Sequence, residues 1–357
     1  MNLPDWPPPW PEIRSAVERC LESGQWGSYH SDVCQALEKR LTSDFQTAAC
    51  RLCCSGTAAL EIALRACRIG TGDEVIVAAF DYPGNFRTIE LLGAKPVLVD
   101  AESDSAGMNV GQLAQTTGDQ VRAVVASHLF GVAADIQAMR ELCDDRGWVL
   151  IEDACQVAGM QIDNRPAGSF GHFATLSFGG SKLVSAGSGG ALLVNSDRLA
   201  ARLGSLLDRP GETFPLSPLQ AAVIDPQLDR LAELNAQRNE TVSFIESELN
   251  SRLPKWSWLS KQKPNHKPAA YKVAWTAESS EQRARIVSQA TSLGLPIGEG
   301  FRSMSGCSDK RCRKPMPTPR ADLLSETLFV LDHRALLIPE SQRHELARLL
   351  IQLHDQV

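Results

Sequence analysis

The chain has 357 residues, which is long enough for two domains or for one large α/β domain with an appendage. Its hydrophobic content of 43% is ordinary for a globular protein, and its formal net charge of −6 argues against a nucleic-acid-binding surface. No apolar run is long enough to cross a bilayer, and the first residues carry neither the basic nor the apolar segment of a secretory signal. We therefore expect a cytoplasmic protein that acts on small molecules, with no nucleic-acid and no membrane partner.

Short apolar segments alternate with helical patterns over the first two thirds of the chain. Strands are predicted over residues 50–55, 74–80, 95–100, 122–131, 148–154, 174–180 and 190–196. Several of these segments are apolar without interruption, which is typical of strands buried on both faces. The clearest helix, over 57–67, has apolar residues along one side. The pattern predicts the α/β class, with a mostly parallel seven-stranded sheet between helices.

The last third of the chain has a different pattern of predicted helices and strands. A long helix is predicted over 227–250, followed by strands over 271–276 and 328–333 and by helices over 280–293 and 340–357. This pattern predicts a smaller α+β domain, so we divide the chain into a large domain with an N-terminal arm, 1–228, and a small domain, 229–357. Residues 302–320 are basic, contain several prolines and lack periodicity; we expect a solvated loop, with a lid as the functional alternative.

The ten cysteines lie mostly in apolar segments, where cysteine acts as a small hydrophobic residue. We expect free thiols, because no secretory signal is present. Cys50 and Cys53 have the spacing of a zinc-binding pair, with Cys307 and Cys312 as a second pair. However, the first pair lies within a predicted strand, where alternate side chains face opposite ways, so we expect no metal site.

Polar residues follow three predicted strands. Ser55, Gly56 and Thr57 begin the helix after the first strand, where free N–H groups attract an anion; a plain N-cap is the structural alternative. Asp153 ends the strand over 148–154, and a carboxylate there must be solvated, paired or held against a cation. Lys182 follows the strand over 174–180, where partial desolvation would lower its pKa and free a nucleophilic amine, unless it reaches water.

The order of these three features matches one cofactor. Pyridoxal phosphate has a phosphate, a pyridine nitrogen that pairs with an anion, and an aldehyde that reacts with an amine. The glycines and serines around Lys182 would let the backbone approach such a cofactor closely. The chain lacks the G-x-x-x-x-G-K-[ST] phosphate loop, and no G-x-G-x-x-G follows its first strand, so a nucleotide-triphosphate or nicotinamide enzyme is not indicated.

At this point the chain resembles a known family, the DegT/DnrJ/EryC1/StrS sugar aminotransferases of pyridoxal-phosphate fold type I. The resemblance covers most of the chain and rests on the succession of segments SGTAAL, GDEVI, LLGAKPVLVD, SHLFG, IEDACQ, PAGSFGHFATLSF, GGSK, AGSGG and PLSPLQAA. It implies pyridoxal 5′-phosphate as cofactor and a homodimer whose active sites lie at the subunit interface.

The resemblance also implies roles by position. Lys182 matches the lysine that forms the Schiff base and moves the proton, and Asp153 matches the carboxylate that faces the pyridine nitrogen. Tyr82, favoured over Phe80 by its spacing from LLGA, matches an aromatic that stacks on the cofactor, and His128 matches a histidine that a purely structural role explains as well. The other matched positions are cofactor contacts: Gly56, Thr57, Ala58, Gln156 and Ser177.

The implied reaction is a transamination in two steps. An amino acid, in this family usually L-glutamate, gives its amino group to the cofactor, and a keto sugar, usually nucleotide-linked, then receives it. Lys182 would act as general base and general acid.

Four positions depart from the family pattern. Ser188 replaces an acidic residue, and Gly179 removes a side chain that sugar enzymes often carry. Thr213 stands where the family has an asparagine that reaches the partner subunit's phosphate, and Pro215 stands at an arginine position. Thr213 would still offer one hydroxyl to that phosphate.

These departures leave other readings open. One alternative is an aminotransferase for a cyclitol or another ketone, and a second is a non-catalytic sensor that binds pyridoxal phosphate or a sugar. A related sugar dehydratase is disfavoured, because such enzymes carry a histidine where this chain keeps Lys182.

Overall fold

A computed structural model describes residues 3–207, 214–249, 252–253, 255–259 and 265–357. Its centre is a seven-stranded sheet in the order β1-β9-β8-β5-β4-β2-β3. Strand β9 pairs antiparallel with both of its neighbours, whereas every other pairing in the sheet is parallel. The strands are β1 (Ala49–Cys53), β2 (Glu74–Ala78), β3 (Lys95–Val99), β4 (Val121–Ser127), β5 (Val149–Asp153), β8 (Phe173–Ser177) and β9 (Gly190–Val194).

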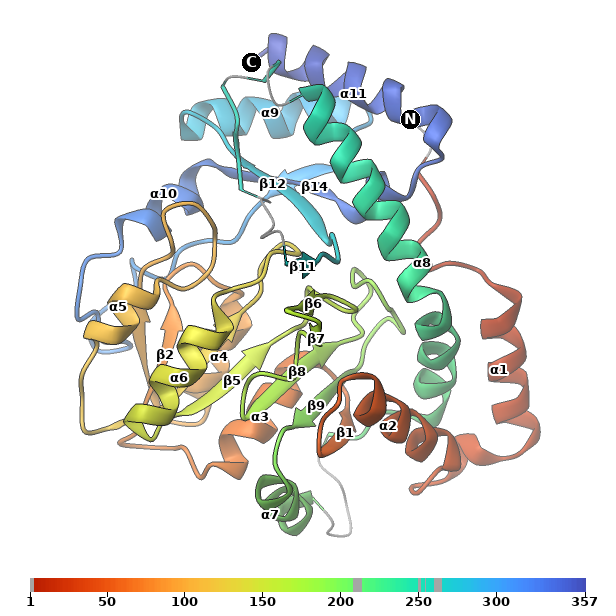
Figure 1. The fold of residues 1–357 in the computed structure, drawn as a ribbon, viewed down its shortest axis with the longest axis vertical. Helices are drawn as coiled ribbons and strands as arrows, with labels where there is room; N and C mark the ends of the chain where they lie inside the picture. The colour runs from red at the N-terminus through yellow and green to blue at the C-terminus, as the bar shows by residue number, and fades with distance from the viewer. Residues whose placement is uncertain (1–2, 208–213, 250–251, 254, 260–264) are drawn as a thin grey trace.

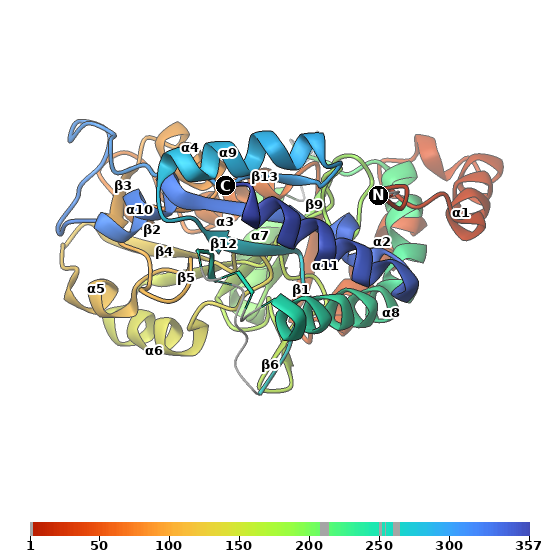
Figure 2. The ribbon, with the colours of Figure 1, turned by 90° about the horizontal axis from the view of Figure 1, so that it is seen from above.

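Helices cover both faces of this sheet (Figures 1 and 2). One hydrophobic cluster joins one face of the sheet to α2 (Asp32–Asp44), α5 (Val110–Gln115), α6 (Ile136–Arg146) and α8 (Pro218–Leu249). A second cluster joins the other face to α3 (Gly56–Ala66), α4 (Pro83–Leu91), α7 (Asp197–Leu207) and α10 (Pro319–Thr327). Because both faces are covered, the strands are apolar throughout, as the sequence predicted. The expected α/β class with a mostly parallel sheet between helices is confirmed.

The last third forms a separate α+β layer, also as expected. Its antiparallel sheet has the order β10-β12-β14-β13 and packs against two helices through a third hydrophobic cluster. Figure 1 shows these helices on the outer side, beside the upper half of α8. The elements are β10 (Ser257–Trp258), β12 (Lys272–Thr276), α9 (Ser280–Ser292), β13 (Ile297–Glu299), β14 (Leu328–Asp332), η2 (His333–Leu337) and α11 (Glu340–Asp355).

Helix α8 connects the two layers. Its first half contributes Ile224 to the cluster under the large sheet, and its second half contributes Ile245 and Leu249 to the cluster of the last third. The predicted boundary between 1–228 and 229–357 falls inside this continuous helix, so that division stays a prediction. Helix α1 (Pro11–Glu22) runs beside α8 and η1 (Gln25–Gly27) follows it, so the N-terminal arm lies against the connecting helix (Figure 1).

A small sheet also ties the last third to the large layer. It has the order β11-β6-β7, in which β11 (His266–Lys267) pairs with β6 (Gln161–Ile162), and β6 pairs with β7 (Arg165–Pro166).

Residues 302–320 form a loop that covers the edge of the large sheet. Leu98 N donates to Arg313 O at 2.8 Å, and Arg313 N donates to Pro96 O at 2.9 Å, so the loop continues the pairing beyond β3. The guanidinium of Arg313 also pairs with Glu74 at 2.6 Å. A covered edge strand cannot pair with another chain. The predicted loop is confirmed, and these contacts give Arg313 a structural role at the sheet edge.

Candidate functional site

The carboxyl ends of β4, β5 and β8 bring three polar side chains together. Ser127, Asp153 and Thr175 are register partners on adjacent strands, so they lie side by side on one face of the sheet. Asp153 is buried and accepts hydrogen bonds from Asn85 Nδ2 at 2.9 Å, Cys155 N at 3.0 Å and Thr175 Oγ1 at 3.3 Å. In parallel sheets, ligands bind at this end of the strands.

Lys182 lies in the turn after β8, close enough to Asp153 for the charge of that carboxylate to affect the lysine pKa. Its Nζ is 5.2 Å from the centre of the Tyr271 ring. Desolvation lowers the pKa of Lys182, but the negative charges that Tyr271, Cys155 and Asp153 can carry outweigh it, and the pKa is raised. The expectation of a lowered lysine pKa is therefore wrong for this structure, because the sequence did not reveal how many acidic groups surround the amine.

The glycines after Lys182 allow backbone conformations and a close backbone contact that other residues would not. Gly187 and Gly189 have φ angles of 76° and 134°, which side chains rarely tolerate. A Cβ atom on Gly190 would lie 2.3 Å from the carbonyl carbon of Ser55, so only glycine lets β9 approach the start of α3. These glycines bring the Lys182 turn and the α3 N-terminus into contact.

The predicted phosphate contacts also come together. Ser55 caps α3 by accepting from Ala58 N at 3.0 Å, and the first N–H groups of a helix have no partner within it. A Cβ atom on Gly56 would lie 3.0 Å from Cβ of Ser177, so the helix start and the Ser177 hydroxyl are neighbours. Gly56, Thr57, Ala58 and Ser177 therefore form one cluster at the carboxyl ends of the strands.

Tyr82, at the start of α4, is the aromatic that faces outward. It is 44% exposed, whereas Phe80 is fully buried in the core, which favours Tyr82 for a cofactor contact. Its ring packs over Gly84, where an added Cβ would lie 2.3 Å from Cε1 of Tyr82. It also lies close enough to Lys182 to affect the lysine pKa. The ring of Phe301, from the last third, contacts Tyr82 at 5.9 Å between centroids.

Gln156 and His128 make hydrogen bonds to backbone N–H groups, and His128 also bonds to the buried side chain of Glu152. Gln156 Oε1 accepts from Phe130 N at 2.8 Å. His128 Nδ1 accepts from Ala134 N at 2.9 Å, so its other ring nitrogen carries the proton and donates to Glu152 at 2.9 Å. Both His128 and Glu152 are fully buried. This geometry favours the structural alternative for His128.

Sequence reasoning missed three residues at this site: Asp81, Asn85 and Tyr271. Asp81 and Asn85 lie behind Asp153, and the Tyr271 hydroxyl is 3.4 Å from Ser181 Oγ, beside Lys182. Asp81 follows a buried strand, as Asp153 does, and that signal could have identified it. Tyr271 gave no such signal, because it comes from the last third of the chain and only tertiary packing brings it to Lys182.

The departures from the family pattern have partial explanations. Ser188 Oγ accepts from Gln220 Nε2 at 2.7 Å, which ties the Lys182 turn to the start of α8. Pro215 is exposed, and the carbonyl of its neighbour Phe214 accepts from Cys54 N at 2.9 Å. A Cβ atom added to Gly179 would lie in ordinary van der Waals contact with Ser177 Oγ at 3.6 Å and Lys182 Cγ at 3.8 Å, so no clash requires glycine there. Thr213 lies outside the described residues.

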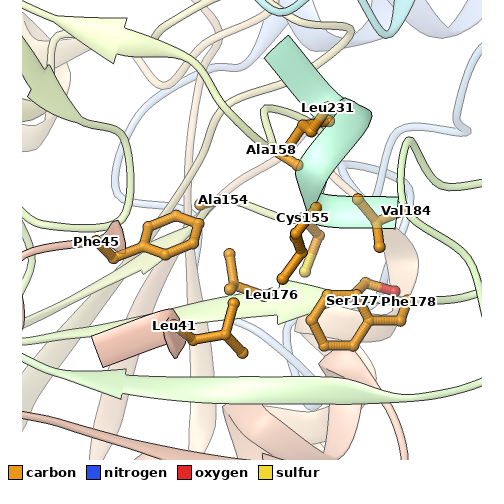
Figure 3. A pocket seen from close by; sticks show the side chains of 11 residues that line it. Leu41, Phe45, Ala154, Cys155, Ala158, Leu176, Ser177, Phe178, Val184 and Leu231 are labelled. Atoms are coloured by element: carbon orange, nitrogen blue, oxygen red, sulfur yellow. The ribbon is translucent and has the colours of Figure 1, made fainter. Parts of the chain in front are cut away.

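A mostly apolar pocket borders the phosphate cluster (Figure 3). It is enclosed by side chains of α2, β8 and α8, and its lining residues include Cys155 and the hydroxyl of Ser177. Neither Lys182 nor Asp153 lines it. An anion needs hydrogen-bond donors, so this pocket lies beside the candidate site and is not the site itself.

The cysteines take the places expected of small hydrophobic residues. Cys50 and Cys53 point to opposite faces of the large sheet, because they belong to different hydrophobic clusters. Within the described part of the chain, no three His, Cys, Asp or Glu side chains are grouped to hold a metal ion. In the same part, no helix combines the length and the apolar character of a membrane span.

Known proteins resemble this chain over nearly its whole length. It is 33% identical to the L-glutamine:2-deoxy-scyllo-inosose aminotransferase of Streptoalloteichus tenebrarius, over 96% of this chain and 92% of that protein. It is 27% identical to the 3-amino-5-hydroxybenzoate synthase of Amycolatopsis mediterranei, over 96% of each chain. It is also 30% identical to the GDP-perosamine synthase of Vibrio cholerae, over 66% of this chain and 67% of that protein.

Solved structures show the same fold. The crystal structure of 3-amino-5-hydroxybenzoic acid synthase superposes with a TM-score of 0.91 at 24% identity, covering 100% of this chain and 99% of that one. A DegT DnrJ EryC1 StrS aminotransferase from Brucella abortus superposes with a TM-score of 0.87 at 24% identity, covering 96% and 95%. The model of the DegT/DnrJ/EryC1/StrS aminotransferase family matches residues 10–349. The chain therefore belongs to the DegT/DnrJ/EryC1/StrS aminotransferase family, whose enzymes depend on pyridoxal phosphate.

Proposed function

We propose that this aminotransferase moves an amino group from an amino acid to a ketone on a polyhydroxylated ring, with Lys182 as the reactive amine. One observation carries the proposal. An amine, a buried carboxylate and the start of a helix come together at the carboxyl ends of the strands of one sheet. Together they match the aldehyde, the ring nitrogen and the phosphate of pyridoxal phosphate.

The residues around this position fit the cofactor. The start of α3 and the Ser177 hydroxyl supply donors for a dianionic phosphate. Asp153 accepts from Asn85 and Cys155 N, and its carboxylate would accept a further hydrogen bond from a protonated ring nitrogen. The half-exposed ring of Tyr82 supplies a flat surface on which an aromatic cofactor would stack.

Each residue then has a task in the reaction. Bound pyridoxal phosphate would supply an electron sink for the charge that remains when an α-proton leaves. Asp153 would keep the proton on the ring nitrogen, and Lys182 Nζ would remove and return the proton at carbon. Since nearby acidic groups raise the pKa of Lys182, its amine must lose a proton before it acts as a base.

The acceptor is proposed to be a keto sugar, such as a nucleotide-linked one, as the resemblance implied. A cyclitol ketone is the second candidate, because the relative at 33% identity across nearly the whole chain is named for 2-deoxy-scyllo-inosose. That same name makes L-glutamine a candidate donor beside L-glutamate.

A homodimer with sites at the subunit interface remains part of the proposal, as does a cytoplasmic location. Large apolar side chains are exposed on the N-terminal arm, notably Trp26 at 55% and Tyr29 at 98%, and such side chains are typical of interfaces. Molar mass measured by light scattering in solution tests the dimer directly.

The function is tested with purified full-length protein. Addition of pyridoxal phosphate is expected to produce a visible absorption band, which L-glutamate or L-glutamine then bleaches. Nucleotide-linked keto sugars and keto-inositols, added separately, should restore the band, and the one that does so identifies the acceptor class. Lys182→Ala should bind the cofactor without forming a covalent adduct that borohydride reduction can trap.

Three results would contradict parts of the proposal. A protein that no amount of pyridoxal phosphate colours would end the cofactor assignment. A coloured protein that no amino donor bleaches would favour a sensor. A covalent adduct that borohydride still traps in Lys182→Ala would show that another lysine carries the reactive amine.

A further inference from the structure

A second buried carboxylate lies directly behind Asp153. Asp81 is 1% exposed and follows the end of β2 by three residues. Its Oδ2 accepts from Ser127 Oγ at 2.9 Å, and its Oδ1 accepts from Tyr82 N at 2.6 Å. None of the ion pairs found among the described residues involves Asp81. A buried carboxylate without a cation is expensive to keep, so its presence requires an explanation.

Asp81 and Asp153 share the same two neutral donors. Asn85 Nδ2 lies 2.9 Å from Asp153 Oδ2 and 3.1 Å from Ser127 Oγ. Ser127 Oγ lies 2.9 Å from Asp81 but 3.5 Å from Asp153. Because a serine hydroxyl has one hydrogen, Ser127 donates to Asp81, and Asn85 donates both to Asp153 and to Ser127. The four side chains therefore form one chain of hydrogen bonds from acid to acid.

The surroundings of Asp81 also link its charge to that of Asp153. The groups that face it are Asp153 on β5, Ser127 on β4, and Asn85 and Tyr82 at the start of α4. Burial and the negative charge of Asp153 raise the pKa of Asp81 to about 7. Asp81 thus changes its charge near neutral pH. It is hydrogen-bonded to Ser127, which lies beside Asp153 on the neighbouring strand.

We propose that Asp81 is a positioning residue for the aminotransferase reaction: through Ser127 and Asn85 it orients Asp153, and when ionised it adds a second negative charge behind that carboxylate. This inference rests on the proposed role of Asp153. An added negative charge stabilises the cationic forms of the cofactor, so the proton on the ring nitrogen is held more firmly above neutral pH than below it.

A simpler role for Asp81 would be to hold the start of α4. Its Oδ1 does accept from Tyr82 N, next to the first residues of that helix. An asparagine side chain offers the same carbonyl acceptor without the charge. The variant Asp81→Asn therefore keeps the structural role and removes the electrostatic one, which makes it the test of the proposal.

The experiment compares the full-length protein, loaded with pyridoxal phosphate, with Asp81→Asn. The visible band of the bound cofactor is recorded between about pH 5 and pH 9, which spans the raised pKa of Asp81. Asp119→Asn is the matched control, because it removes an exposed aspartate two residues before β4. Ser127→Ala is the second variant, because it removes the link through Ser127 and leaves both carboxylates in place, with Asn85 Nδ2 still 3.4 Å from Asp81 Oδ1.

We expect the wild type and Asp119→Asn to show an inflection near neutral pH that Asp81→Asn lacks. We also expect the deprotonation of the cofactor to move down by roughly one pH unit in Asp81→Asn, as for a charge on the order of 10 Å away. Ser127→Ala should keep the inflection, since the charge remains, but lower kcat with KM little changed, since Asn85 loses one of its acceptors and holds Asp153 less firmly.

Three outcomes overturn the inference. Identical pH profiles for the wild type and Asp81→Asn, with a normal cofactor band in both, would reject the role of Asp81 while the proposed function stands. A uniform loss of the band at every pH in Asp81→Asn would reduce Asp81 to a structural cap. A wild type that never binds the cofactor would reject the proposed function and the inference together.

Discussion

Glu152 and Asp153 are neighbours in the sequence, yet they have opposite surroundings. Glu152 accepts from Phe170 N and Gly171 N, each at 2.9 Å, and from His128. Burial acts to raise the pKa of Glu152, but the hydrogen bond and the charge interaction with His128, together with the hydrogen bonds from Gly171 N and Gly168 N, outweigh it, and the pKa is lowered. Asp153 has only neutral side-chain donors and a second carboxylate, Asp81, behind them.

The difference shows how one strand end serves two purposes. Successive side chains of a strand point to opposite faces, so β5 directs Glu152 to one side of the sheet and Asp153 to the other. The Glu152 side is closed by loop backbone and holds the structure together. The Asp153 side opens toward Lys182 and carries a negative charge that a cationic ring nitrogen would compensate.

The largest expected effect comes from Asp153→Asn. This change removes the charge on the open side and keeps the shape, so the transamination rate should fall by about 10²-fold or more, as when a preorganised electrostatic partner is lost. Steady-state kinetics measure the rate, and circular dichroism checks the fold. A variant that retains near wild-type kcat would show that the proposed ring-nitrogen contact is not needed.

Glu152→Gln should cost stability instead of rate. The glutamine NH₂ would face either the backbone N–H donors of Phe170 and Gly171 or the N–H donor of His128, so we expect the free energy of unfolding to drop by about 3 kcal/mol. Urea denaturation measures the loss, and activity per folded molecule should stay within a few-fold. If instead stability holds and activity falls, the two carboxylates have been assigned the wrong way round.

The contributions of Asp81 and Glu152 to folding stability should also depend on pH in opposite directions. The folded-state pKa of Asp81 is about 7, above its unfolded value of about 3.9, so its contribution to stability is lost as pH rises between these values. The folded pKa of Glu152 is lowered, so its contribution is present above the unfolded pKa and is lost as the pH falls through the folded pKa.

This pH dependence is measured on the apoprotein by thermal unfolding. Asp81→Asn should gain stability relative to the wild type as the pH rises from about 4 to about 7, whereas Glu152→Gln should lose its deficit at low pH. Parallel curves for Asp81→Asn and wild type would mean that Asp81 is already ionised at acid pH.

The smallest effect is expected from Thr175→Val. Its hydroxyl donates to Asp153 Oδ1 over 3.3 Å, a longer hydrogen bond than those from Asn85 and Cys155 N, and valine has the same shape. We expect less than about a tenfold change in rate and a stability change of about 1 kcal/mol. A larger drop in rate, seen in the same kinetic assay, would make Thr175 as important to Asp153 as Asn85.

The sequence alone predicted the architecture and the central pair of the proposed site. Uninterrupted apolar segments predicted strands buried on both faces, and the structure confirms the mostly parallel sheet and the α+β last third. Lys182 and Asp153 were predicted because one follows a buried strand and the other ends one, and such positions lie at one edge of a parallel sheet. These properties follow from local patterns, which a short segment carries by itself.

Only the tertiary structure decided the surroundings of these residues. Asp81 meets Ser127 across 46 residues of sequence, and Asn85 meets Asp153 across 68. Tyr271 meets Ser181 across 90 residues. In that position Tyr271 contributes to the raised pKa of Lys182, which the sequence did not predict. Burial, hydrogen-bond partners and charge state depend on which strands pair and in which register, and a local pattern contains no record of partners that lie far along the chain.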